Sequence, residues 1–146
     1  MEDYSCLKLK NQLCFPLYSV SNLIIRNYKP LLDKINLTYT QYITMMVLWE
    51  KDNINEKELC DSLFLKSNTI TPLLKKLEEK GYILIHKASN DKRNIIISLT
   101  EEGNKLKDKA KDIPNSISKS IGISMDEAKY LYGILYKILE TNYGNL

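Results

Sequence analysis

The chain has 146 residues, 44% of them hydrophobic, which is enough for one domain with its own core and too short for two ordinary domains. Its 21 basic and 18 acidic residues give a net charge of +3, so charge alone does not indicate a nucleic-acid-binding protein. No apolar run reaches the roughly 18 residues that a membrane span needs. The first residues are acidic, unlike a signal peptide. We therefore expect a cytoplasmic protein that makes no membrane contact.

The first third of the chain predicts two helices. Helical residues are expected from about Leu7 to Asp33, and Pro16 and Pro30 are points at which this helix can kink or restart. Thr38 or Thr40 can cap the second helix, because a hydroxyl accepts a hydrogen bond from the backbone of the first helical turn.

The next segment predicts a helix, a tight turn and a second helix. Asn55 and Glu58 have the spacing of a capping box, so a short helix should cover Glu56 to Leu63. Ser67 or Asn68 can cap the helix that follows, in which apolar residues recur at helical spacing. These apolar residues are Ile70, Leu73, Leu74 and Leu77.

A hairpin and two further helices complete the pattern. Tyr82 to Ala88 and Asn94 to Leu99 are rich in residues that favour strands, and the polar run between them predicts a hairpin tip. Thr100 can then cap a helix. Two apolar stripes with the spacing of coiled coils follow, and they predict dimerisation. The stripes are Leu106, Ala110, Ile113, Ile117 and Ala128, Leu131, Leu135, Ile138.

This order of elements predicts a mainly α protein with a small β-hairpin wing, an α+β fold of the winged helix-turn-helix type. We expect residues 36–103 to form the DNA-binding part, and residues 1–35 and 104–146 to form dimerisation helices. The polar face of the fourth helix, together with Arg93 at the hairpin tip, then contacts double-stranded DNA. The alternative is an ordinary solvated face. The candidate helix residues are Ser67, Asn68, Thr69, Thr71, Lys75 and Lys76.

Particular runs of residues resemble a known family. The runs Ser67 to Glu78, Asp91 to Arg93 and Ile97 to Gly103 resemble the MarR family of bacterial transcription regulators, and the likeness extends from about Lys10 to Leu139. Within that family, the first of these runs and Asn11 to Phe15 resemble the branch that senses organic hydroperoxides. The resemblance implies that Asp91 braces the wing and that Arg93 enters the DNA minor groove.

The same resemblance implies that Cys14 is a redox sensor. A thiol attacks a peroxide as its thiolate, which a helix N-terminus and hydrogen-bond donors can stabilise. Tyr18 lies one helical turn beyond Cys14 and can share its face. By resemblance, Tyr28 and Tyr39 of the partner subunit supply two further donors. The alternative is that Cys14 is simply a small buried apolar residue.

The other cysteines narrow the chemistry. Cys6, Cys14 and Cys60 lack the spacing of metal ligands, so we expect free thiols and neither a metal nor a cofactor. Some members of the branch that the chain resembles oxidise through a second cysteine near the C-terminal helices, but no cysteine follows Cys60 here. The resemblance therefore implies a route in which oxidised Cys14 is capped by a low-molecular-weight thiol or is oxidised further. Cys60 is expected to be buried on its helix, and His86 to be a surface strand residue.

The leading hypothesis is therefore a peroxide-responsive repressor. The reduced homodimer binds a pseudo-palindromic operator, and oxidation of Cys14 releases it. A second hypothesis is a MarR-type regulator that a small aromatic ligand releases. A third is a thiol peroxidase, but the only arginines are Arg26 and Arg93, and neither is near Cys14 in the sequence to polarise a peroxide. We therefore expect no enzyme activity.

Overall fold

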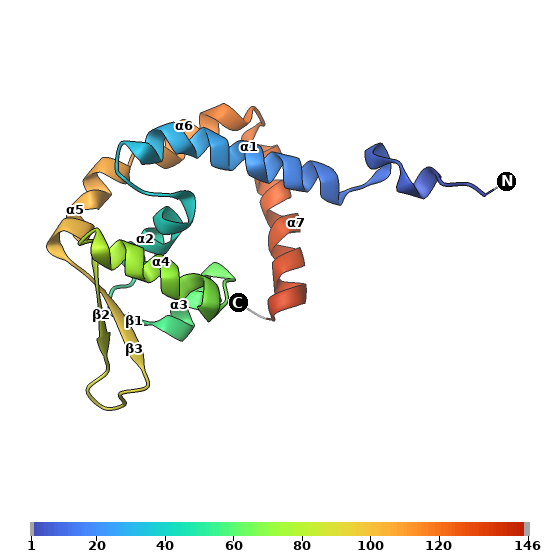
Figure 1. Ribbon diagram of the computed structural model, residues 1–146. Helices are drawn as coiled ribbons and strands as arrows, with labels where there is room; N and C mark the ends of the chain where they lie inside the picture. The colour runs from blue at the N-terminus through green and yellow to red at the C-terminus, as the bar shows by residue number, and fades with distance from the viewer. Residues whose placement is uncertain (1, 145–146) are drawn as a thin grey trace.

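The computed structural model describes residues 2–144 and is mostly helical, with a three-stranded sheet of order β1-β3-β2 (Figure 1). The predicted α+β class, with a hairpin wing on a helix-turn-helix, is confirmed. The main elements are α1 (Cys14–Asp33), α2 (Tyr39–Glu50), β1 (Ile54–Asn55), α3 (Glu56–Leu63), α4 (Ser67–Glu79), β2 (Ile83–Lys87), β3 (Ile95–Leu99), α5 (Glu101–Ala110), α6 (Ile113–Ile121) and α7 (Met125–Tyr143).

The start of α1 differs from the prediction. A helix from about Leu7 was expected, but the helix begins at Cys14, and only two short 3-10 turns, Ser5–Leu7 and Leu9–Asn11, precede it. Pro16 is consequently the third residue of α1. At this position a helix has no acceptor for the backbone N–H that proline lacks, so Pro16 is tolerated in the first turn.

Side-chain caps set the starts of several helices. Thr38 caps α2 in a full capping box, in which its hydroxyl accepts from the Gln41 N–H and the Gln41 side chain accepts from the Thr38 N–H. The caps predicted for α3 and α5, and one for α7, are also present, at Asn55, Thr100 and Ser124. The cap predicted for α4 is wrong. Lys66 occupies that position without a side-chain hydrogen bond, and Ser67 is the first helical residue.

The wing is anchored by a strand that the sequence pattern did not reveal. β2 and β3 form the predicted antiparallel hairpin, in which Ile83 faces Leu99. The two-residue strand β1 adds to the other edge of β3 and pairs Ile54 with Ile97. Ile54, Ile83 and Ile97 are all buried, so the base of the wing is part of the core.

The stripe from Leu106 to Ile117 was expected on one helix and at a dimer interface, and both expectations are wrong. The helix breaks after Ala110, and α6 restarts with Pro114 as its second residue, where proline is favourable. The stripe residues Leu106, Ala110, Ile113 and Ile117 are at most 5% exposed and belong to this chain's own core.

Two other helices leave large apolar faces open. None of the residues in α7 is buried, although the helix is 19 residues long. The first half of α1 is similarly open, and Figure 1 shows it extending away from the winged part beside α6. The exposed apolar residues on these helices include Phe15, Leu17, Val20, Leu23, Leu131, Ile134, Leu135 and Ile138. No helix among residues 2–144 is long and apolar enough to cross a membrane.

One lysine joins two distant parts of the fold. The Nζ atom of Lys80, at the end of α4, donates to the carbonyl of Asn36 at 2.8 Å and to Oε1 of Gln41 at 2.9 Å. Burial, with the nearby charge of Lys76, lowers the pKa of Lys80. The turn between α1 and α2 is therefore fastened to the C-terminal end of α4.

Candidate DNA interface and redox site

The helix α4 has one buried face and one exposed polar face. Ile70, Leu73, Leu74 and Leu77 pack into the core, which fixes the rotation of the helix. All six helix residues predicted to contact DNA are exposed on the remaining surface. The first turn offers hydroxyl and amide groups, while Lys75 and Lys76 add positive charge further along. This combination can meet base edges as well as phosphates.

The wing tip carries Arg93 on a braced turn. One carboxylate oxygen of Asp91 accepts a hydrogen bond from the backbone N–H of Arg93 at 3.0 Å and lies 3.5 Å from its Nε atom. The Asp91 carbonyl also accepts from the Asn94 N–H at 3.0 Å. The Arg93 side chain is nonetheless 93% exposed, so its charge is available to a ligand.

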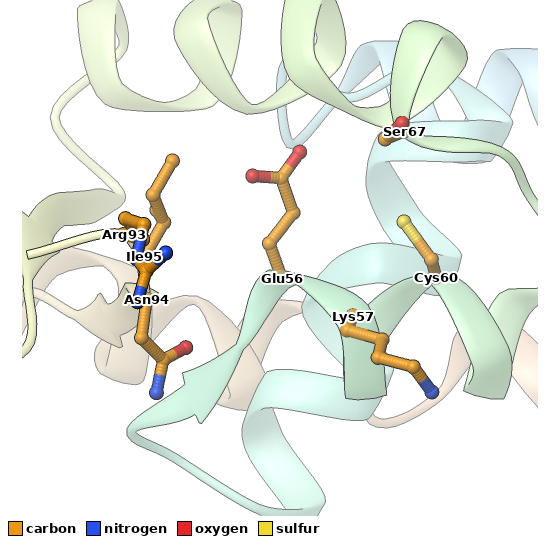
Figure 2. A pocket seen from close by; sticks show the side chains of 7 residues that line it. All are labelled: Glu56, Lys57, Cys60, Ser67, Arg93, Asn94 and Ile95. Atoms are coloured by element: carbon orange, nitrogen blue, oxygen red, sulfur yellow. The ribbon is translucent and has the colours of Figure 1, made fainter. Parts of the chain in front are cut away.

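A cavity of about 450 Å³ lies between the wing, α3 and the start of α4 (Figure 2). Figure 2 shows Glu56 extending from α3 into this space, between Ser67 on one side and the segment from Arg93 to Ile95, at the start of β3, on the other. The sequence reasoning missed Glu56. Its Oε1 atom accepts a hydrogen bond from the Thr71 hydroxyl at 2.9 Å. This contact joins two helices, and no local sequence pattern predicts it.

Cys14 is the first residue of α1 and its thiol is free and exposed. The N–H groups of a first helical turn have no intrahelical acceptors, so they are available to hydrogen-bond a group placed beside them. Tyr18 lies one turn further along α1, and its side chain is 68% exposed. Within one chain, both groups are therefore open to solvent.

Tyr28 and Tyr39 lie together, with ring centroids 4.9 Å apart, and Tyr42 packs 5.7 Å from Tyr28. Burial, followed by the neighbouring tyrosines, raises the pKa of Tyr28 to about 12. Burial also raises the pKa of Tyr39. Both phenols consequently keep their protons at neutral pH and can donate hydrogen bonds. Tyr42 was not predicted as part of this group, although it follows Tyr39 at helical spacing.

One chain does not bring Cys14 and these tyrosines together. Tyr28 follows Cys14 by 14 positions on the same helix, so they are separated by about 21 Å along its axis. Beside Tyr39 is a recess of about 230 Å³. Its lining combines apolar side chains with Arg26 and with the ion pair of Lys29 and Asp33. A group that reaches Tyr39 from outside can enter here, and Tyr28 packs against Tyr39.

The remaining thiols differ in burial, and the burial predicted for Cys60 is confirmed. Cys60 is buried on α3, and burial, together with nearby Glu56 and Asp61, raises the pKa of its thiol, so it is a poor nucleophile at neutral pH. Cys6 is exposed before α1. His86 is an exposed residue of β2, as expected.

A polar recognition face on α4 beside a braced basic wing defines a winged helix-turn-helix DNA-binding protein. Comparisons agree with this class. A family model described as transcriptional regulator SarA/Rot matches residues 26–110. The organic hydroperoxide resistance transcriptional regulator of Bacillus subtilis is 45% identical over 135 residues, which cover 92% of each chain. The chain therefore belongs to the SarA/Rot family of MarR-like transcriptional regulators.

Solved structures of one relative are similar over nearly the whole chain. AbfR of Staphylococcus epidermidis has been solved in its reduced form bound to DNA, with 35% identity and a TM-score of 0.76. The match covers 92% of this chain and 94% of that one. Overoxidized AbfR bound to DNA matches with the same identity and TM-score and covers 92% and 95%.

Proposed function

We propose that this chain is a homodimeric repressor that binds DNA when Cys14 is reduced and is released when a hydroperoxide oxidises Cys14. The observation that carries this proposal is the placement of the thiol. Cys14 begins a helix whose apolar face is uncovered, while the buried phenols suited to stabilise its thiolate lie about 21 Å away on the same chain. A two-fold partner can close that distance. The organic hydroperoxide resistance regulator of Bacillus subtilis supports the assignment.

The homodimer is supported by the exposed apolar faces of α1 and α7. A second copy that covers both faces removes most of this apolar surface from water, which is the main driving force for association. In such a dimer the start of one α1 can enter the partner's recess beside Tyr39, bringing Cys14 and Phe15 to the phenols. We therefore assign residues 1–35 and 104–146 to dimerisation, with α7 as the main C-terminal contributor.

DNA recognition is assigned to residues 36–103. Two α4 helices in a two-fold dimer can read half-sites about 34 Å apart, one turn of B-DNA, on a pseudo-palindromic operator. Ser67, Asn68, Thr69 and Thr71 face base edges, and Lys75 and Lys76 face phosphates. Arg93 enters the adjacent minor groove, with Asp91 holding the tip in place. We place the protein in the cytoplasm, where thiols are kept reduced.

Release is assigned to a mixed disulfide at Cys14. The thiolate attacks a hydroperoxide, its O–O bond breaks, and Cys14 becomes a sulfenic acid as an alcohol leaves. A low-molecular-weight thiol then forms a disulfide with that sulfur, and water leaves. AbfR has been solved overoxidized and bound to DNA, so a more oxidised sulfur need not release this fold. A bulkier adduct in the recess beside Tyr39 forces the two subunits apart more effectively.

A mobility-shift assay tests the proposal. Reduced protein on its own upstream DNA should give a shifted band, and cumene hydroperoxide with a small thiol should abolish it. Dithiothreitol should restore the band. Cys14→Ser should bind and stay bound, whereas Cys6→Ser and Cys60→Ser should be released like the wild type. Peroxide release that persists in Cys14→Ser would falsify the sensor assignment.

The recess also favours one alternative. Its apolar lining suits a small aromatic acid, for which Arg26 offers a positive charge while Lys29 is paired with Asp33, and such a ligand would release DNA on binding. Cys14→Ser separates the two hypotheses, because a ligand-released regulator should still respond to the aromatic acid after this change. Stoichiometry separates the repressor from a thiol peroxidase, since a sensor consumes about one peroxide per chain and an enzyme consumes many.

A further inference from the structure

The hydroxyl of Thr71 lies between two hydrogen-bond acceptors. Its Oγ1 atom is 2.9 Å from Oε1 of Glu56 and 2.8 Å from the carbonyl oxygen of Ser67. A carboxylate and a carbonyl have no proton to give, and a hydroxyl has one proton and two lone pairs. The single proton of Thr71 is therefore shared between these two acceptors. What the side chain offers outward is lone pairs and a methyl group.

We infer that Thr71 reads an amino group of adenine or cytosine as a hydrogen-bond acceptor, and that Glu56 sets this preference by holding the Thr71 proton. In the major groove only adenine N6 and cytosine N4 carry donors, while guanine O6 and thymine O4 are acceptors. A hydroxyl oxygen whose proton is already donated within the protein attracts the first pair and repels the second. This inference rests on the proposed function, in which α4 reads DNA.

The negative charge of Glu56 is unfavourable on a surface that binds DNA, and its presence there supports a specific role for this residue. Glu56 is the first residue of α3, where the helix dipole favours a negative charge. Towards DNA, however, the same charge faces the cavity that Ser67 and Arg93 line, and it opposes phosphate binding (Figure 2). A carboxylate here weakens non-specific affinity, and its contact with Thr71 gives selectivity at one base pair in return.

The test begins with an operator selected from a random-sequence duplex library by the reduced wild-type protein. Kd is then measured for duplexes that carry each of the four base pairs at every position of one half-site. We expect one position at which adenine or cytosine is preferred about fivefold or more over guanine and thymine. Thr71→Val keeps the shape and the methyl group but removes the oxygen, and should reduce this preference to below about twofold. Thr71→Ser should keep the preference.

The role of Glu56 is tested at the same position. Glu56→Ala leaves the Ser67 carbonyl as the only acceptor for the Thr71 proton, so the hydroxyl is held by one bond instead of two. The base preference should weaken there while affinity for all duplexes rises. Glu58→Ala is the matched control, because it removes an equal charge from the same helix at a residue that pairs with Lys51 and not with Thr71. It should raise affinity without changing any base preference.

The possible outcomes distinguish a failure of this inference from a failure of the proposed function. If the wild type selects no sequence, DNA reading by α4 fails and the inference fails with it. If the wild type selects a two-fold operator but Thr71→Val keeps every base preference, the inference alone is wrong. A preference for guanine or thymine at the Thr71-dependent position also overturns it, and so does a base preference that Glu56→Ala leaves intact.

Discussion

A mixed-dimer experiment follows from the 14 positions that separate Cys14 and Tyr28 on one helix, about 21 Å along its axis. If the phenols serve the partner's thiol, a chain without Cys14 and a chain without the phenols can complement each other. A dimer of Cys14→Ser with the double variant Tyr28→Phe, Tyr39→Phe contains one intact site, formed by the thiol of the second chain and the phenols of the first. Its other site has neither group.

The magnitude can be worked out from this arrangement. A hydrogen bond to a charged group contributes about 1.5–3 kcal/mol, so losing even one donor to the thiolate should slow oxidation about tenfold or more. In an equimolar mixture that exchanges subunits freely, about half of the dimers are mixed, as two-fold symmetry and random pairing require. About half of all Cys14 thiols should then react at the wild-type rate, because each lies in a mixed dimer.

The assay is thiol-trapping kinetics in a Cys6→Ser, Cys60→Ala background, which leaves Cys14 as the only thiol. The double tyrosine variant alone should give one slow phase. The mixture should give a fast phase of about half the amplitude and a slow phase for the rest. A mixture that remains wholly slow after verified subunit exchange refutes donation across the dimer. A fast phase in the double tyrosine variant alone refutes the role of the phenols.

The remaining predictions concern the fold, the DNA contact and the phenols. Gly103→Ala places a Cβ atom 1.9 Å from the backbone oxygen of Tyr82, so it should destabilise the protein by about 3 kcal/mol and lower Tm by about 6–12 °C in thermal denaturation. Arg93→Ala removes one contact from each subunit of the proposed dimer, so it should reduce the slope of log K against log salt by about 1.8, and Lys75→Ala should do so more weakly. Because the pKa of Tyr28 is raised from 10.0 to about 12 on folding, its contribution to stability is complete below pH 10 and is lost as pH rises towards 12. The stability of Tyr28→Phe should therefore decrease less steeply than that of the wild type as the pH rises above 10.

Each of these predictions has a control or a contrary result. Asn104→Ala adds no atom near Tyr82 and should leave Tm nearly unchanged, so equal losses in both variants would contradict the argument from Gly103. Lys119→Ala on α6 should not alter the salt slope, and a slope unaffected by Arg93→Ala would exclude a wing contact. Identical alkaline unfolding curves for Tyr28→Phe and the wild type would contradict the buried phenol.

The helices and the wing could be predicted from the sequence because their signals are local. Caps such as Thr38 and Thr100 act within one helical turn, and the strands of the hairpin are neighbours in the chain. The two-residue strand β1 is too short to have a periodicity. The break before α6 was missed because its apolar stripe continues in register across the break, although Pro114 marks where a new helix begins.

The redox and DNA sites could be predicted only in part. Residue type and resemblance predicted Cys14, Tyr28 and Tyr39, but the meeting that we propose for them depends on a second chain, which no single-chain pattern contains. The pairing of Glu56 with Thr71 depends on how α3 packs against α4, over 15 positions of sequence. Contacts of this kind follow from tertiary packing, and the sequence spacing of the two residues gives no sign of them.

The hydrogen bonds of Lys80 couple the end of α4, which belongs to the proposed DNA-binding part, to the turn before α2, which lies beside the proposed redox site. The Gln41 oxygen that accepts from Lys80 also completes the first turn of α2, which begins at Tyr39, and the Asn36 carbonyl belongs to the turn just before it. A displacement of Tyr39 by an adduct in its recess cannot be absorbed in that turn without breaking these bonds. The C-terminal end of α4 would then follow, together with the core into which Ile70, Leu73 and Leu77 pack. The opposite end of α4 is the turn of Ser67 to Thr71, which we propose lies in the DNA groove.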